Sequence, residues 1–75
     1  MVKKYYTFSS YRVDEVACFS TDEIYYRLLC ENYSEVKAKA IANLVETMSP
    51  VDYLMFFDND GATCITIRCW TYEND

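Results

Sequence analysis

The sequence has no histidine and only one glycine and one proline among its 75 residues. Without an imidazole, the chain lacks the one side chain whose unperturbed pKa lies near neutrality, so general-base catalysis by histidine is excluded. The scarcity of glycine and proline, together with 52% hydrophobic residues, excludes a disordered linker. We therefore expect residues 1–75 to fold as a single domain around one core.

Long apolar runs and positive charges are also scarce. No segment approaches the roughly 18 apolar residues that a membrane-spanning helix needs, so no membrane association is expected. Seven Lys and Arg stand against twelve Asp and Glu, for a net charge of −5. Affinity for nucleic acids comes mainly from clustered cations, so direct nucleic-acid binding is not expected. The first residues do not resemble a secretory leader, which favours a cytoplasmic location.

The four cysteines are Cys18, Cys30, Cys64 and Cys69. Structural zinc sites usually take ligands in close pairs such as C-x2-C. The nearest pair here, Cys64 and Cys69, lies five residues apart in a segment with strand character, where an odd offset places two side chains on opposite faces. We therefore expect buried, reduced thiols, with disulfides and zinc as weaker alternatives, and no metal or cofactor.

Two amphipathic helices are predicted in the middle of the chain. Ser20 and Glu23 have the spacing of a capping box, and Phe19 with Ile24 that of a hydrophobic staple. These signals begin a first helix over 21–31, which Asn32 can end.

A second N-cap candidate, Ser34, precedes apolar residues at helical spacing. This pattern predicts a helix over 35–48. Pro50 prevents the helix from continuing much further.

The C-terminal third predicts a β-hairpin with strands over 51–58 and 62–72, because Asp60-Gly61 is typical of a tight turn. A two-residue turn would place three pairs on the core face: Phe56 with Ile65, Leu54 with Ile67, and Asp52 with Cys69. The opposite face would carry Phe57 beside Cys64, Met55 beside Thr66, Tyr53 beside Arg68 and Val51 beside Trp70. The segment from Asp58 also resembles the start of a calcium loop, but its twelfth position is Cys69 rather than Glu.

The N-terminal segment predicts two further strands, over 2–8 and 11–19, joined by a turn at Ser9-Ser10. A helix over 11–19 is the alternative. With strands, the element order is β-β-α-α-β-β, an α+β domain in which two short helices pack on one face of an antiparallel sheet.

No catalytic constellation is evident, so an enzyme is not expected. Nucleophile motifs such as Ser-x-x-Lys and phosphate-binding glycine loops are absent. The carboxylate pair Asp14-Glu15 is interpreted as solvated surface, and the pair Asp22-Glu23 as part of a helix cap.

Tyrosine and tryptophan are abundant, with eight Tyr and one Trp. These residues favour surfaces where one end of the side chain is dry and the other wet, which includes protein interfaces. Two short helices can cover one face of a sheet, so the other face would be available to a protein partner. The predicted binding residues on that face are Tyr53, Met55, Phe57, Arg68, Trp70 and Tyr72. Alternatively, the N-terminal segment folds over this face.

Acidic side chains provide a second candidate surface, formed by Asp14, Glu15, Asp58, Asp60, Glu73 and Asp75. Further carboxylates come from Asp22, Glu23 and Glu31. An acidic array of this kind can occupy a groove built for phosphates and inhibit a nucleic-acid enzyme by mimicry. The competing interpretation is that the charge serves solubility alone.

A small, acidic, Tyr-rich domain without catalytic residues resembles in general character the small early proteins that bacteriophages use against host machinery, anti-CRISPR and anti-restriction proteins among them. This resemblance implies an inhibitor that blocks a host protein by steric or phosphate-mimicking occlusion. We therefore expect a non-enzymatic protein-binding module. A homodimer packed through its sheet is the alternative, and a thiol- or metal-responsive protein is a third hypothesis.

Overall fold

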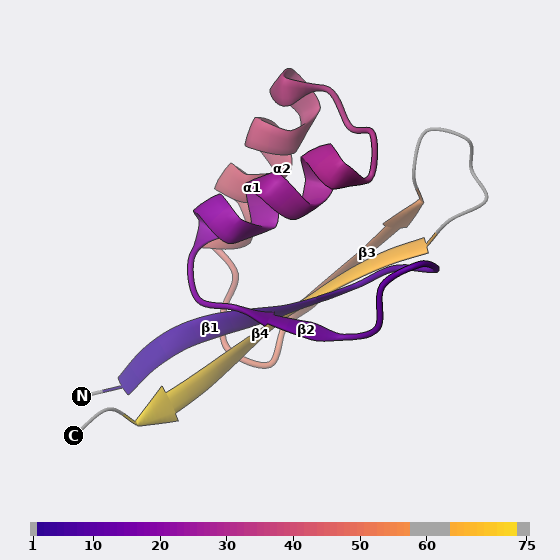
Figure 1. Ribbon diagram of the computed structural model, residues 1–75. Helices are drawn as coiled ribbons and strands as arrows, with labels where there is room; N and C mark the ends of the chain where they lie inside the picture. Colours follow the sequence, from indigo (N-terminus) through magenta and orange to yellow (C-terminus); the bar gives the residue numbers. More distant parts are fainter. Residues whose placement is uncertain (1, 58–63, 74–75) are drawn as a thin grey trace.

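Four strands form one antiparallel sheet in the order β2-β1-β4-β3 in the computed structural model, which describes residues 2–57 and 64–73. The strands are β1 (Val2–Ser9), β2 (Val16–Cys18), β3 (Tyr53–Phe57) and β4 (Cys64–Glu73). Between β2 and β3 come α1 (Thr21–Cys30) and α2 (Glu35–Glu46). Both helices lie on the same side of the sheet (Figure 1). The predicted α+β class and the order β-β-α-α-β-β are confirmed.

The core lies between the helices and one face of the sheet, because side chains alternate between the two faces of each strand. Five inward-facing residues of β1 and β4 are buried: Tyr6, Phe8, Ile65, Ile67 and Cys69. The helices meet them with Ile24, Leu28, Ala38 and Val45.

Helix α1 begins as predicted, since the Ser20 hydroxyl accepts a hydrogen bond from the Glu23 backbone N–H. The Glu23 carboxylate accepts from the backbone N–H of Phe19, one residue before the position that a standard capping box uses. The Phe19 ring is 61% exposed and stacks on Tyr5, whereas Ile24 is fully buried. The two side chains therefore lie in different parts of the molecule, and the predicted staple is wrong.

Helix α1 ends at Cys30, one residue before the predicted end, in a Schellman arrangement. The Tyr33 N–H bonds to the Leu28 carbonyl and the Asn32 N–H to the Leu29 carbonyl. Asn32 has the left-handed φ of 67° that this ending requires. Asparagine tolerates this conformation better than most residues because its short polar side chain can hydrogen-bond locally.

Helix α2 begins at its predicted cap, where the Ser34 hydroxyl accepts from the Lys37 N–H. It ends at Glu46, two residues before the predicted end. The Thr47 hydroxyl bonds to the Leu44 carbonyl, and Met48 turns into the core. Side-chain capping and burial of Met48 thus end the helix before Pro50 can.

The predicted strand over 11–19 is wrong for most of its length, because only Val16–Cys18 joins the sheet. Ser10 and Val13 instead close a tight turn through reciprocal backbone hydrogen bonds of 2.9 and 3.3 Å. The Ser10 hydroxyl accepts from the Arg12 and Val13 N–H groups as well. These local bonds satisfy backbone groups that a strand would otherwise pair.

The predicted hairpin register is confirmed by the pairing of β3 with β4. Phe56 lies opposite Ile65, Leu54 opposite Ile67 and Tyr53 opposite Arg68. Both strands differ from the predicted bounds, 51–58 and 62–72, and the turn at 59–61 lies outside the described residues.

Strand β3 begins two residues later than predicted because the chain turns immediately before it. The Asp52 N–H bonds to the Ser49 carbonyl, and Val51 has a φ of 66°. Asp52 still pairs with Cys69 through one backbone bond of 3.0 Å, but its side chain is exposed rather than in the core.

Candidate functional site

The sheet face opposite the helices carries the predicted binding residues. Alternation places Tyr53, Met55 and Phe57 of β3 on this face, together with Arg68, Trp70 and Tyr72 of β4. Figure 1 shows both helices on the other side of the sheet. The structure thus brings all six residues to one surface, called here the open face.

Arg68 lies at the centre of the open face, between two aromatic rings. Its guanidinium carbon is 5.0 Å from the centroid of the Trp70 ring and 6.0 Å from that of Tyr53. Tyr53 and Arg68, which the predicted hairpin places side by side, therefore meet through the ring and the guanidinium, and the contact of Arg68 with Trp70 is closer. An exposed cation held over ring faces in this way is available for a hydrogen-bonding anion.

Trp70 is half-buried on the open face rather than in the core under the helices. Its indole N–H donates to the Thr7 hydroxyl over 2.9 Å, which fixes the ring against β1. Thr7 itself is only 9% exposed. The ring is thus held in place before any partner binds, which lowers the entropy lost on association.

A second aromatic group extends the open face across β1. Tyr5 stacks on Phe19 with ring centroids 5.9 Å apart and meets Tyr72 edge-on at 5.6 Å. Tyr5 and Phe19 were not among the predicted binding residues. The alternation of Lys3, Tyr5 and Thr7 could have indicated Tyr5, whereas Phe19 was assigned to a helix staple.

The open face differs in charge from the rest of the chain. Lys3 and Arg68 are the charged residues at its strand positions, and none of those positions holds Asp or Glu. The whole chain carries a net charge of −5. Aromatic and apolar groups here therefore surround cations only.

The predicted acidic surface is described only in part. Asp14 and Glu15 are exposed in the segment between β1 and β2, and Glu73 is the last residue of β4. Asp58, Asp60 and Asp75 lie outside the described residues. An acidic array that mimics phosphates therefore stays a prediction.

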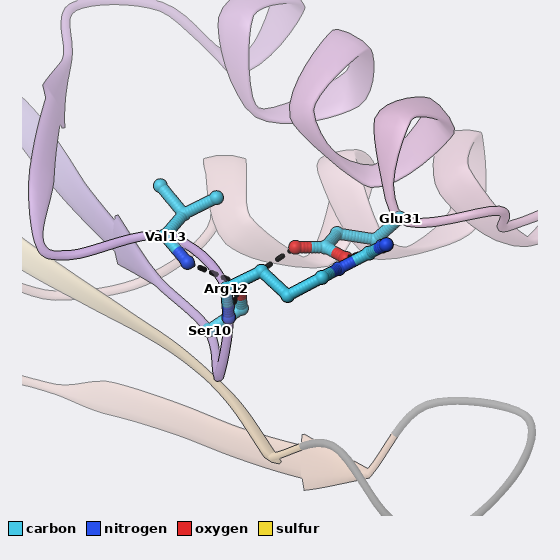
Figure 2. Close-up of polar contacts among 4 residues, drawn as sticks. All are labelled: Ser10, Arg12, Val13 and Glu31. Carbon is cyan, nitrogen blue, oxygen red and sulfur yellow. Dashed lines mark hydrogen bonds and ion pairs between the residues drawn. The ribbon is translucent and has the colours of Figure 1, made fainter.

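Glu31 does not belong to that surface, because its side chain is 4% exposed. Figure 2 shows its carboxylate accepting from the Ser10 hydroxyl and from the Arg12 guanidinium, each over 2.6 Å. A carboxylate at a helix C-terminus faces the negative end of the dipole, so it needs such partners. The arrangement ties the segment after β1 to the end of α1.

The cysteines fall into two classes, all with free thiols. Cys18 and Cys69 are buried as predicted, and burial is the main reason that the pKa of each thiol is raised. Cys30 is exposed and Cys64 half-buried, so the prediction of burial is wrong for these two. Within residues 2–57 and 64–73, no three His, Cys, Asp or Glu side chains gather as metal ligands would.

A groove of about 570 Å³ runs between α2 and β3 on the helix side of the sheet. Its apolar lining comes mainly from Ile41 and Leu44 of α2 and from Leu54 and Phe56 of β3. At one end the Tyr33 hydroxyl donates to the Phe57 carbonyl over 3.1 Å.

Comparison of the chain with protein-family models, curated proteins and solved structures returns no match. No helix in the described part of the chain is long and apolar enough to cross a membrane.

Proposed function

We propose that this chain is a non-enzymatic protein-binding module that contacts its partner through the open face. The observation that carries the proposal is the fixed arrangement of Arg68 between Trp70 and Tyr53 on a sheet face without helices. Trp, Tyr and Arg are the residue types that most often dominate binding energy at protein interfaces. Their clustering on one exposed surface is typical of an interaction site.

The charge of the open face favours a particular kind of partner. Lys3 and Arg68 stand among apolar side chains, and no strand position on the same face holds a carboxylate. A complementary surface would therefore be apolar with at least one acidic side chain placed to reach Arg68. Two open faces packed together would instead bring like charges into contact, so the face-to-face homodimer is the less favoured alternative.

The proposed role is steric occlusion of a partner protein, as in the phage inhibitors that the sequence resembles. All four cysteines are free thiols. Such thiols suit a reducing compartment, so the proposal places the protein in the cytoplasm.

The test is differential capture from a bacterial lysate with matched charge-reversal variants. Arg68→Glu changes the open face, whereas Lys39→Glu makes the same change in charge on the exposed side of α2. We expect the wild type and Lys39→Glu to recover the same protein, and Arg68→Glu to recover at least about tenfold less. Circular dichroism of each variant checks that the fold is kept.

Recovery that falls equally in both variants would assign the effect to net charge. Recovery that Arg68→Glu leaves unchanged would remove the open face as the contact. A lysate that yields no protein depending on Arg68 also counts against the proposal.

A further inference from the structure

Strand β3 lies at the edge of the sheet and pairs on one side only, with β4. In an antiparallel pair, residues alternate between those whose backbone groups bond to the neighbouring strand and those whose groups point away. The Cys69 N–H bonds to the Asp52 carbonyl, which sets the phase of this alternation. The backbone groups of Tyr53, Met55 and Phe57 therefore point to the free edge. The Tyr33 hydroxyl reaches the Phe57 carbonyl there, which confirms the direction.

The composition of β3 is unusual for a free edge. Natural proteins protect edge strands with charged residues, proline or bulges, because an unprotected edge pairs with other chains. The five residues of β3 are Tyr-Leu-Met-Phe-Phe, without a charge or a proline. Tyr53, Met55 and Phe57 are each more than half exposed.

The other side of the same edge is apolar as well. Leu54 and Phe56 face the groove beside α2, where Leu44 is 54% exposed. A strand added to β3 would therefore cover apolar side chains on both faces while pairing the free backbone groups.

We propose that β3 is a dimerisation edge and that its occupant is a second copy of this chain, paired antiparallel with Met55 opposite Met55. In this register Tyr53 lies opposite Phe57 on the open face, and Leu54 opposite Phe56 on the groove side. Every cross-strand pair within residues 53–57 is apolar, so none of these pairs brings like charges together. The Phe57 carbonyl has a second lone pair for the new bond besides the one that Tyr33 uses.

The two-fold arrangement also places the α2–β3 grooves of the two copies side by side. It brings the Leu44 regions of two α2 helices toward the same axis, so the exposed apolar side chains on the two subunits face each other. The open faces remain accessible and join into one longer surface. The dimer is thus independent of the proposed function and compatible with it.

Disulfide trapping tests the partner and the register together. The variants Tyr53→Cys and Phe57→Cys are made in a Cys30→Ser, Cys64→Ser background, because Cys64 lies opposite Phe57 within the chain. Across the proposed interface, residues 53 and 57 come about 5.5 Å apart between Cα atoms, which a disulfide can span. Two copies of residue 53 would be about 13 Å apart, which is too far.

We expect rapid cross-linking when the two variants are mixed under mild oxidation and little when either is oxidised alone. Val36→Cys on α2, an exposed position away from β3, measures the background of random collisions. Mixtures that link no faster than Val36→Cys would overturn the proposal. Faster linking of Tyr53→Cys with itself would overturn the register.

Sedimentation equilibrium of the unmodified chain gives a second, independent readout. We expect the measured mass to double as protein concentration rises. Added salt should strengthen the association, because it screens the repulsion between two copies that each carry a net charge of −5. Met55→Lys should remain monomeric while keeping the wild-type circular dichroism spectrum. A wild type that stays monomeric up to about 1 mM, a concentration at which even weak pairing registers, would exclude the dimer and leave the edge for a foreign strand.

Discussion

Val51 has a backbone conformation that conflicts with its side chain. Its φ of 66° lies in the left-handed region, where a β-branched residue is strained. Pro50 precedes it, and the Asp52 N–H bonds to the Ser49 carbonyl, which is the pattern of a turn that favours glycine at this position. The Val51 N–H also bonds to the Cys69 carbonyl over 2.8 Å, so the sheet holds the residue in place.

Val51→Gly should therefore raise the free energy of unfolding by about 1 kcal/mol, the strain relieved less the entropy that glycine adds to the unfolded chain. Urea denaturation measures the difference. Val36→Gly, at an exposed position in the first turn of α2, serves as the control, and we expect it to lower the free energy of unfolding by no more than about 0.5 kcal/mol. A lower midpoint for Val51→Gly would contradict the strained turn.

Trp70 is the residue whose change should separate binding from folding. Trp70→Ala should weaken association with the partner by at least about 2 kcal/mol, because it removes both the ring and the support of Arg68. Titration calorimetry against the captured partner measures this loss. Tyr26→Ala, at an exposed position of α1, is the control. Unchanged affinity would remove Trp70 from the contact surface, and unfolding of the variant would assign it a structural role.

At the scale of elements, the C-terminus of α2 depends on a residue from another part of the chain. Its last turn contains no basic residue. The Lys4 ammonium of β1 donates instead to the Glu46 and Met48 carbonyls, over 3.2 and 2.9 Å. A cation at this end satisfies free carbonyls and complements the helix dipole.

Lys4→Met should lower the free energy of unfolding by about 1 kcal/mol, since it leaves those carbonyls without their charged donor. Lys3→Met provides a matched control on the opposite face of the same strand, where we expect a change within about 0.5 kcal/mol. Equal effects of the two substitutions, measured by thermal or urea unfolding, would refute the capping role of Lys4.

The link between α1 and the segment after β1 gives a further prediction at this scale. Glu31→Gln should destabilise the fold by about 1–3 kcal/mol, because a buried carboxylate that two donors contact becomes a neutral amide. Glu15→Gln, at an exposed position, is the control. Urea midpoints that differ by less than the error would show that the buried ion pair contributes nothing.

The elements with local signals are those that the sequence predicted well. Ser20, Ser34 and Asn32 act through neighbours in the chain, so their caps could be inferred. The two-residue turn predicted at Asp60-Gly61 gave the correct pairing of Phe56 with Ile65. The segment over 11–19, which was predicted as a strand, is held partly by a contact with a distant residue, since Arg12 bonds to Glu31, nineteen residues away. Such distant contacts leave no periodic pattern to read. The β3 and β4 residues of the open face were predicted. Tyr5 and Phe19 were not, because placing them on this face requires knowing that β1 lies beside β4.

At the scale of the whole molecule, buried protonated groups couple stability to pH. Burial is the main cause that raises the pKa values of Cys18, Cys69 and Tyr6. A raised pKa means that the group keeps its proton to a higher pH in the folded state than in the unfolded state. For the two thiols, the stabilisation from this difference is therefore fully present below their ordinary pKa of 9.0. It is lost as pH rises through the higher pKa of the folded state.

Urea midpoints measured under reducing conditions should accordingly fall as pH rises from about 8 to about 10. Cys69→Ser, whose hydroxyl does not ionise in this range, should flatten the decline. A midpoint that rises over the same interval, or a slope that Cys69→Ser leaves unchanged, would contradict the assignment of the slope to the Cys69 thiol.

The pairing of β1 with β4 determines when the protein can fold during synthesis. Val2 lies opposite Glu73, and the ladder runs along the whole of β1, so this strand needs a neighbour that is synthesised well after it. Until β4 has been made, β1 has one unpaired edge and the core lacks Ile65 and Ile67. Folding of the domain therefore waits for β4, and in the meantime the nascent β1 is open to pairing with other chains.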